Sequence, residues 1–176
     1  IEIESFVHGA ICVCYSGQCF LSSLIGRRSA NRGQCAQPCR LPYELVDKYD
    51  EVQEAPGKHL LSPKDLAGIE KIGEFINAGV ASLKIEGRMK SPSYVAAVVS
   101  VYRHALDNYG QMGDVQEAYD QLSQAFSRGF TTAYLDNRRD NDIMSYTRPN
   151  NRGTLVGRIS GFEGADALIA FEKDIS

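Results

Sequence analysis

Acidic residues are absent from the stretch between Ser5 and Tyr43. Four arginines lie in this stretch with no neighbouring carboxylate to neutralise them, and all five cysteines of the chain lie there too. Soft thiolate ligands close to positive charge are typical of an active-site or cofactor-binding segment. The sequence therefore predicts the candidate site in the segment from Glu4 to Cys39, which Arg40 follows.

A strong net charge, an apolar run of membrane-spanning length and a basic-then-apolar leader are also absent. The 176 residues carry a net charge of -3, with 43% hydrophobic and 23% charged residues. This composition fits an ordinary globular protein of one domain plus a small annex. Any case for nucleic-acid binding must therefore rest on the local arginines. We expect no membrane association and a cytoplasmic location.

The sequence lacks the common hydrolase motifs: it has no Gly-x-Ser-x-Gly, no His-Glu-x-x-His and no phosphate loop. No standard hydrolase mechanism is therefore predicted. Three histidines are present, and His8 lies next to the glycines and cysteines of the candidate segment. His59 precedes a predicted strand and His104 lies within a predicted helix, so we expect both to be structural.

The cysteines form two pairs. Six residues separate Cys12 from Cys19, three separate Cys35 from Cys39, and fifteen lie between the pairs. An odd total of five fits a disulfide framework poorly. Four thiolates suit zinc or an iron–sulfur cluster, but the spacing matches neither the common zinc pattern nor the ferredoxin pattern, so buried free thiols are an open alternative. The role of Cys14 is also open.

Hydrophobic periodicity and capping signals predict alternating strands and helices. The expected strands cover residues 1–7, 41–46, 59–61 and 81–85, and the expected helices cover residues 17–24, 62–77, 91–109 and 115–126. The stretch 41–46 contains Pro42 and is expected at a sheet edge. Strand–helix alternation predicts an α/β fold with a parallel sheet, as in the later portion of a (β/α) TIM-like barrel.

Composition changes after Gly129. A polar stretch and a turn at 150–153 precede two strand patterns, 154–159 and 167–171, which predict a hairpin around Gly164. One hairpin is not stable alone. We therefore predict that residues 1–130 form the later part of a barrel domain, residues 131–152 a linker, and residues 153–176 the start of a small β-rich domain. Open barrel edges should be covered by a further segment or by a second copy of the chain.

Charged residues cluster where a predicted strand ends. Lys84 and Glu86 would point to the same side of that strand, and Arg88 begins the following loop. In barrel enzymes the carboxyl ends of the strands face the active site. With Glu4, expected opposite Lys84, and with His8, these residues are the catalytic candidates. The alternative is a salt-bridged rim with no catalytic role.

These motifs resemble the collagenase-like peptidase family U-32. Its signature is Glu-x-Phe-x-x-Gly-(Ser/Ala)-aliphatic-Cys, then four residues, then Gly-x-Cys-x-aliphatic-Ser. The chain matches it without departure at Glu4, Phe6, Gly9, Ala10, Ile11, Cys12, Gly17, Cys19, Leu21 and Ser22. Further similar blocks are Asn31-Arg32-Gly33, Cys35, Gln37-Pro38-Cys39-Arg40, Ser62-x-Lys64-Asp65-Leu66 and Lys84-Ile85-Glu86-Gly87-Arg88-Met89-Lys90. The resemblance covers residues 1–130, and residues 150–159 resemble the start of the extra β domain of longer members.

The resemblance implies a barrel-like catalytic domain of which this chain holds the later part. Some members of the family are described as collagenases or virulence-associated proteases. Others support hydroxylation of a pyrimidine in tRNA or rRNA using prephenate, or hydroxylation of ubiquinone, and several carry a [4Fe–4S] cluster. The positions that match the cluster ligands are Cys12, Cys19, Cys35 and Cys39.

The favoured hypothesis is an iron–sulfur enzyme that modifies tRNA or rRNA, with prephenate as the co-substrate that the resemblance suggests. Arg27, Arg28, Arg32 and Arg40 would bind phosphates of the RNA, or would balance the negative charge of a thiolate cluster. The alternatives are a collagenase-like peptidase and a non-catalytic binding fragment. Clustered thiols and arginines, without a recognisable nucleophile–base pair, favour the RNA enzyme over the peptidase.

Overall fold

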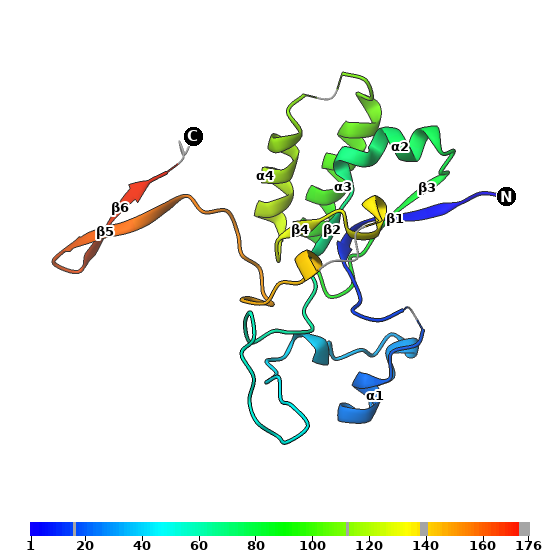
Figure 1. Cartoon of the computed structure of the whole chain (residues 1–176). Helices are drawn as coiled ribbons and strands as arrows, with labels where there is room; N and C mark the ends of the chain where they lie inside the picture. Colours follow the sequence, from blue (N-terminus) through cyan, green and yellow to red (C-terminus); the bar gives the residue numbers. More distant parts are fainter. Residues whose placement is uncertain (16, 112, 138–140, 173–176) are drawn as a thin grey trace.

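The computed structural model describes residues 1–15, 17–111, 113–137 and 141–172. Helices α2, α3 and α4 gather at one end of the molecule, while α1 and a long irregular segment lie at the other (Figure 1). The strands are β1 (Glu4–Ala10), β2 (Asp65–Ala67), β3 (Ser82–Ile85), β4 (Phe130–Thr131), β5 (Gly157–Glu163) and β6 (Asp166–Phe171). The α-helices are α1 (Leu21–Gly26), α2 (Ile72–Asn77), α3 (Pro92–Asp107) and α4 (Val115–Ala125). Short 3-10 helices are η1 (Ala30–Arg32), η2 (Pro38–Arg40), η3 (Ile69–Lys71), η4 (Ala133–Asp136) and η5 (Asn141–Ile143).

The main sheet is mixed, with strand order β3-β1-β2-β4. Strand β1 runs parallel to β3, and β2 runs parallel to β4. Strands β1 and β2 are antiparallel, with His8 opposite Ala67. The α/β class is therefore confirmed, whereas the prediction of a wholly parallel sheet is wrong at the central pair.

The largest error of the sequence prediction falls on residues 59–77. No strand forms at 59–61, and the expected helix start at Ser62 is replaced by β2, so helical structure begins at η3 and α2. The cause is tertiary. Asp65 is buried and accepts bonds from the Arg128 backbone and guanidinium at 2.9 and 2.7 Å, while Leu66 is buried beside it. These long-range contacts outweigh the local capping signal.

Other boundaries also differ. The first strand begins at Glu4 rather than Ile1, and the first helix runs from Leu21 to Gly26 instead of 17–24. No strand forms at 41–46, where a single bridge joins Val46 to Val52. There Tyr43 donates its backbone N–H to Lys58 and its hydroxyl to Pro38, so the chain folds back on η2 rather than joining the sheet.

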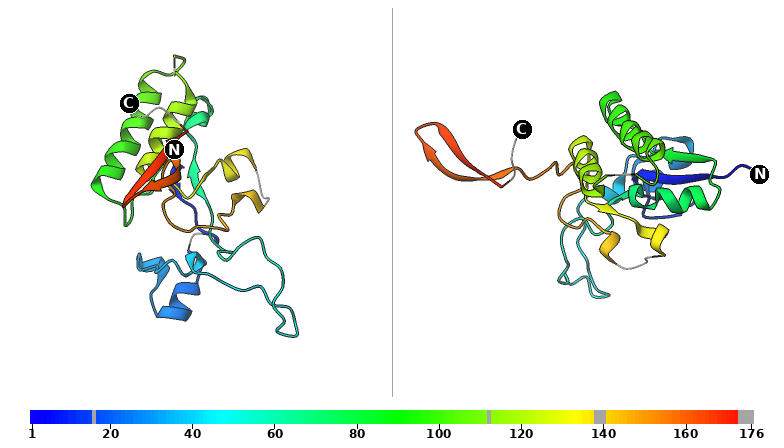
Figure 2. Two further views of the ribbon diagram at one scale, coloured as in Figure 1. Left: turned by 90° about the vertical axis from the view of Figure 1, so that its left-hand side faces the viewer. Right: turned by 90° about the horizontal axis from the view of Figure 1, so that it is seen from above.

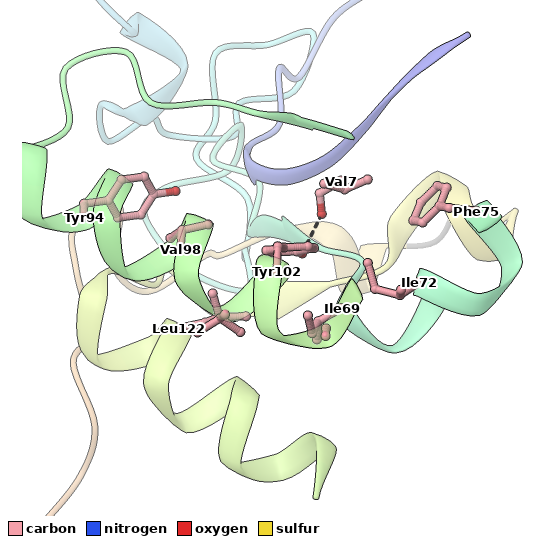
Figure 3. Packing of buried hydrophobic residues seen from close by; sticks show 10 residues of the cluster. Val7, Ile69, Ile72, Phe75, Tyr94, Val98, Tyr102 and Leu122 are labelled. Atoms are coloured by element: carbon pink, nitrogen blue, oxygen red, sulfur yellow. Dashed lines mark hydrogen bonds between the residues drawn. The ribbon is translucent and has the colours of Figure 1, made fainter. Parts of the chain in front are cut away.

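The hydrophobic core lies between β1 and the helices α2, α3 and α4 (Figure 3). The Tyr102 hydroxyl donates to the Val7 carbonyl at 2.9 Å, which ties α3 to β1. Ser91 caps α3 as predicted, because its Oγ accepts from the Tyr94 backbone at 3.2 Å. Tyr109 was expected on the same buried face but lies beyond the end of α3 and is 50% exposed. The predicted face is confirmed at Tyr94, Val98, Val101, Tyr102 and Ala105.

Strands β5 and β6 form the predicted hairpin, although its first strand begins at Gly157 rather than at residue 154. The hairpin extends away from the rest of the molecule (Figures 1 and 2). Every residue of β6 is exposed. Parts of the predicted linker, residues 138–140, and of the predicted β-rich unit, residues 173–176, lie outside the described residues. Within the described residues, no helix combines the length and hydropathy that crossing a membrane requires.

Candidate functional site

The site begins where β1 passes the end of β3. Gly9 has φ +116°, and a Cβ there would lie 2.9 Å from both the Cβ and the carbonyl oxygen of Glu86. Glycine permits both this backbone conformation and the close approach. The start of the cysteine loop, which we define as residues 11–40, is thereby held beside Glu86.

The cysteine loop encloses a cavity of about 500 Å³, the thiol cavity, whose wall also includes Glu86 and Arg88. The four predicted ligands all line it: Cys12, Cys19, Cys35 and Cys39. Every cysteine of the chain is a free thiol. Burial raises the pKa of the Cys39 thiol; Arg40 opposes this shift, and the other three lining thiols reinforce it. The structure thus brings the four cysteines around one space, with Cys14 outside its wall.

The four thiols surround the thiol cavity without converging on one point. Among the described residues, no three His, Cys, Asp or Glu side chains are placed to hold a single metal ion. A mononuclear zinc site needs its sulfur ligands about 2.3 Å from one ion. The arrangement therefore differs from a closed zinc site.

Two arginines fix the shape of the cysteine loop. Arg88 donates to the Cys35 carbonyl at 2.7 Å and also to the Gly33 carbonyl. Arg40 donates to the Ile11 carbonyl at 3.2 Å, to Ser62 Oγ at 2.8 Å and to the Pro63 carbonyl. These bonds join the segments that carry the cysteines to the start of β2 and the loop after β3.

A second cavity of about 750 Å³, the cationic cavity, adjoins the thiol cavity. The two cavities share the wall residues Cys35, Gln37, Arg40 and Arg88. The wall of the cationic cavity also contains the positively charged Arg28, Lys90 and Arg128 and the aromatic Tyr94 and Phe126. None of the described residues that line it is acidic.

The buried carboxylate of Asp65 holds Arg128 in the wall of the cationic cavity. The two side chains form a buried ion pair at 2.7 Å, and the Arg128 Nε donates to the Pro149 carbonyl at 2.7 Å. Lys90 lies across the same wall, and its pKa is lowered to about 8, first by burial and then by the positive charge of Arg128. Positive charge is therefore concentrated in a partly desolvated space.

The remaining catalytic candidates, Glu4, His8 and Lys84, line neither cavity, and Ser82 rather than Lys84 lies opposite Glu4. His8 is 1% exposed in the core, and burial, followed by the charge of Lys90, lowers its pKa to about 4. Glu4 is exposed at the opposite end of β1 from the cysteine loop and accepts a bond from Ser82. Lys84 is exposed on β3 and lines neither cavity. Of the five catalytic candidates, Glu86 and Arg88 line the thiol cavity.

The predicted phosphate-binding arginines divide into two groups. Arg40 and Arg28 line the cationic cavity, and Arg28 also donates to the Gln34 carbonyl at 3.0 Å. Arg27 and Arg32 are exposed on the cysteine loop and line neither cavity.

Sequence reasoning did not single out Lys90, Arg128 or Gln37 as site residues. Lys90 belongs to the block that resembles the family, so that block was the available signal. Arg128 carries no local signal, because its place depends on Asp65, far away in sequence. Gln37 adopts φ +59°, a conformation that the sequence does not reveal.

The fold and the site together define an α/β protein whose sheet supports a four-thiol cavity beside a cationic cavity. The sequence-family model of Peptidase family U32 matches residues 1–145. The chain belongs to this family.

Curated relatives differ in their names. "tRNA hydroxylation protein P1" of Bacillus subtilis (strain 168) is 45% identical, over 98% of this chain and 44% of its own length. A 23S rRNA 5-hydroxycytidine synthase of Escherichia coli (strain K12) is 43% identical, over 89% of this chain and 25% of its own. A "Collagenase" of Porphyromonas gingivalis (strain ATCC BAA-308 / W83) is 40% identical, over 79% of this chain and 35% of its own. The chain spans less than half of each of these relatives. No solved structure matches it.

Proposed function

We propose that this chain carries the iron–sulfur part of an enzyme that hydroxylates a pyrimidine in tRNA or rRNA. The observation that carries the proposal is the thiol cavity: four free cysteines line one space of about 500 Å³. Relatives named for hydroxylation of tRNA and 23S rRNA, at 45% and 43% identity, support the RNA substrate.

The donor set fits a [4Fe–4S] cluster. Such a cluster takes four cysteine thiolates, each on a different iron, so thiols spread around a cavity wall meet its needs. The ligands would be Cys12, Cys19, Cys35 and Cys39, and the bound cluster would supply one-electron chemistry. Arg40 and Arg88 hold the backbone of the ligand segments, and the charge of Arg40 opposes the rise that burial causes in the pKa of Cys39.

The co-substrate and the complete fold belong to the same proposal. Prephenate, which the family resemblance suggests as co-substrate, would bind in the longer protein. The sheet would be the later part of a (β/α) barrel, completed by a further segment or by a second copy. The parallel pairs β1–β3 and β2–β4 support this barrel, and the antiparallel β1–β2 pair departs from the pattern of parallel barrels.

The proposal is tested by Cys19→Ser in anaerobically purified full-length protein. Wild type should contain about four irons per chain and absorb broadly in the visible region, as expected for a [4Fe–4S] cluster. The variant should lose most of both signals because it lacks one of the four thiolates. Cys14→Ser is the matched control and should keep them, since Cys14 lies outside the thiol cavity wall. Equal iron content in wild type and Cys19→Ser would reject the cluster assignment.

The second candidate function is peptide hydrolysis, which the collagenase relative at 40% identity favours. The same variant separates the two functions. Cleavage of a collagen peptide that survives Cys19→Ser, without any RNA modification by wild type, would favour the peptidase.

A further inference from the structure

Lys90 is a basic residue of the cationic cavity whose ammonium contacts aromatic rings rather than a charged partner. Its ammonium lies over the Phe126 ring and 5.1 Å from the centre of the Tyr94 ring. None of the ion pairs formed by the described residues includes it. By contrast, the guanidiniums of Arg40 and Arg88 are held on loop carbonyls.

The surroundings of Lys90 leave its charge uncompensated. The nearby carboxylate is Asp65, whose two oxygens both accept bonds from Arg128. Burial, Arg128 and Arg40 all disfavour the charged ammonium, and Asp65 offsets them in part. A half-buried cation surrounded by other cations is stabilised when an anion enters beside it, because attraction is stronger where water is partly excluded.

Two residues of this wall have a strained backbone. Gln37 and Met89 adopt φ +59° and +60°, and both line the cationic cavity. Residues other than glycine pay a conformational cost there, and such strain clusters at binding and catalytic sites. Met89 directly follows Arg88, which forms part of the wall shared with the thiol cavity.

We propose that the cationic cavity binds a phosphate of the substrate RNA, with Lys90 donating to the phosphate oxygens. The proposal rests on the proposed RNA-modifying function and identifies where the sugar–phosphate backbone of the RNA binds. Each nucleotide of RNA carries one phosphate on its sugar. A phosphate bound in the cationic cavity therefore places the adjoining nucleotide next to the wall that this cavity shares with the thiol cavity. The Tyr94 and Phe126 rings form the apolar side of the site.

The test compares Lys90→Gln, Lys90→Arg and Lys48→Gln with wild type in the full-length protein. Lys48 is the matched control, because its ammonium also lies over an aromatic ring, 4.7 Å from the centre of Tyr49, but on an exposed turn outside both cavities. Binding of a structured tRNA is titrated at several salt concentrations. Binding of inorganic pyrophosphate is measured by calorimetry in parallel, and circular dichroism checks the fold.

Lys90→Gln should weaken RNA binding about tenfold and flatten the slope of log affinity against log salt by about 0.7 to 0.9, as for one lost phosphate contact. It should also lose pyrophosphate binding. Lys90→Arg should retain much of the RNA binding and of the pyrophosphate binding, and Lys48→Gln should match wild type in both measurements.

Unchanged RNA affinity and slope in a folded Lys90→Gln protein would overturn the proposal. If that variant lost pyrophosphate binding alone, the cavity would serve a small anion and the RNA would bind elsewhere, which leaves the proposed function intact. If wild type carried the cluster but bound no RNA, both this site assignment and the proposed RNA function would fall.

Discussion

At the scale of single residues, basic side chains around the cysteine loop have two distinct roles. Arg40 and Arg88 donate to backbone carbonyls and so fix the loop. Lys90 contacts aromatic rings and faces the cationic cavity. Composition alone cannot separate these roles, because both depend on contacts between residues distant in sequence. The four cysteines were predictable from the family resemblance, whose blocks also contain Lys90, while Arg128 required the fold.

His8 gives a prediction about pH. Its pKa is about 4 in the folded protein against an ordinary value of 6.5, so the unfolded chain binds more protons between these values. Stability should therefore fall as pH decreases from 6.5 to 4, by up to about 3 kcal/mol from this residue. Urea unfolding across this range should show a shallower pH dependence in His8→Gln. The exposed His104 supplies the control, and His104→Gln should retain the wild-type dependence; equal slopes in all three proteins would refute the assignment.

At the scale of helices and strands, capping and periodicity signals predicted an element correctly where nearby residues determine its ends. Ser91 and Pro92 fixed the start of α3, and its buried face followed from the helical period. Local signals failed at β2, where Ser62 and Pro63 imitate a helix start. There Asp65 accepts a bond from Arg128, 63 positions later in the sequence, and this long-range contact favours a strand over a helix. Short strands with distant partners carry too little periodicity to be recognised.

The junction of β1 and β3 gives a prediction at this scale. Gly9→Ala places a methyl group 2.9 Å from the Glu86 carbonyl oxygen at a φ of +116°. The strand ends should separate, with a loss of about 1–3 kcal/mol in the free energy of unfolding and a lower iron content after reconstitution. Gly26→Ala is the control, because a Cβ there meets nothing within 4 Å. Chemical denaturation and iron analysis measure both effects, and equal values for the two variants would contradict this account of the junction.

At the scale of the whole molecule, the β5–β6 hairpin stands apart from the sheet and helices (Figure 2). Its main contacts run between its own two strands, and the apolar side chains of Ile159, Phe162 and Phe171 are exposed. By contrast, the segment before it is anchored, because the Arg152 backbone donates to Ser127 at 2.7 Å. The division predicted near residue 153 stays a prediction.

Truncation tests that division. A chain ending at Gly153 should have the same free energy of unfolding in urea as the 176-residue chain, to within about 0.5 kcal/mol, because the removed strands bury little against the sheet. Removing Arg152 as well should lower the midpoint, since its bond to Ser127 is lost. A large loss of stability from the first truncation would mean that the hairpin supports the sheet.

The wall shared by the two cavities has a thermodynamic consequence. Cys35 and Gln37 face both spaces, and Arg88 holds the carbonyl of Cys35 while lining both. A ligand that reorganises this wall from one side alters the affinity of the other side, and linkage requires the effect to be equal in both directions. If RNA bound in the cationic cavity raises the affinity of the protein for the proposed cluster, then loss of the cluster must lower the affinity for RNA by the same factor. Under the proposed function, protein without the cluster would then bind RNA less tightly than protein that carries it.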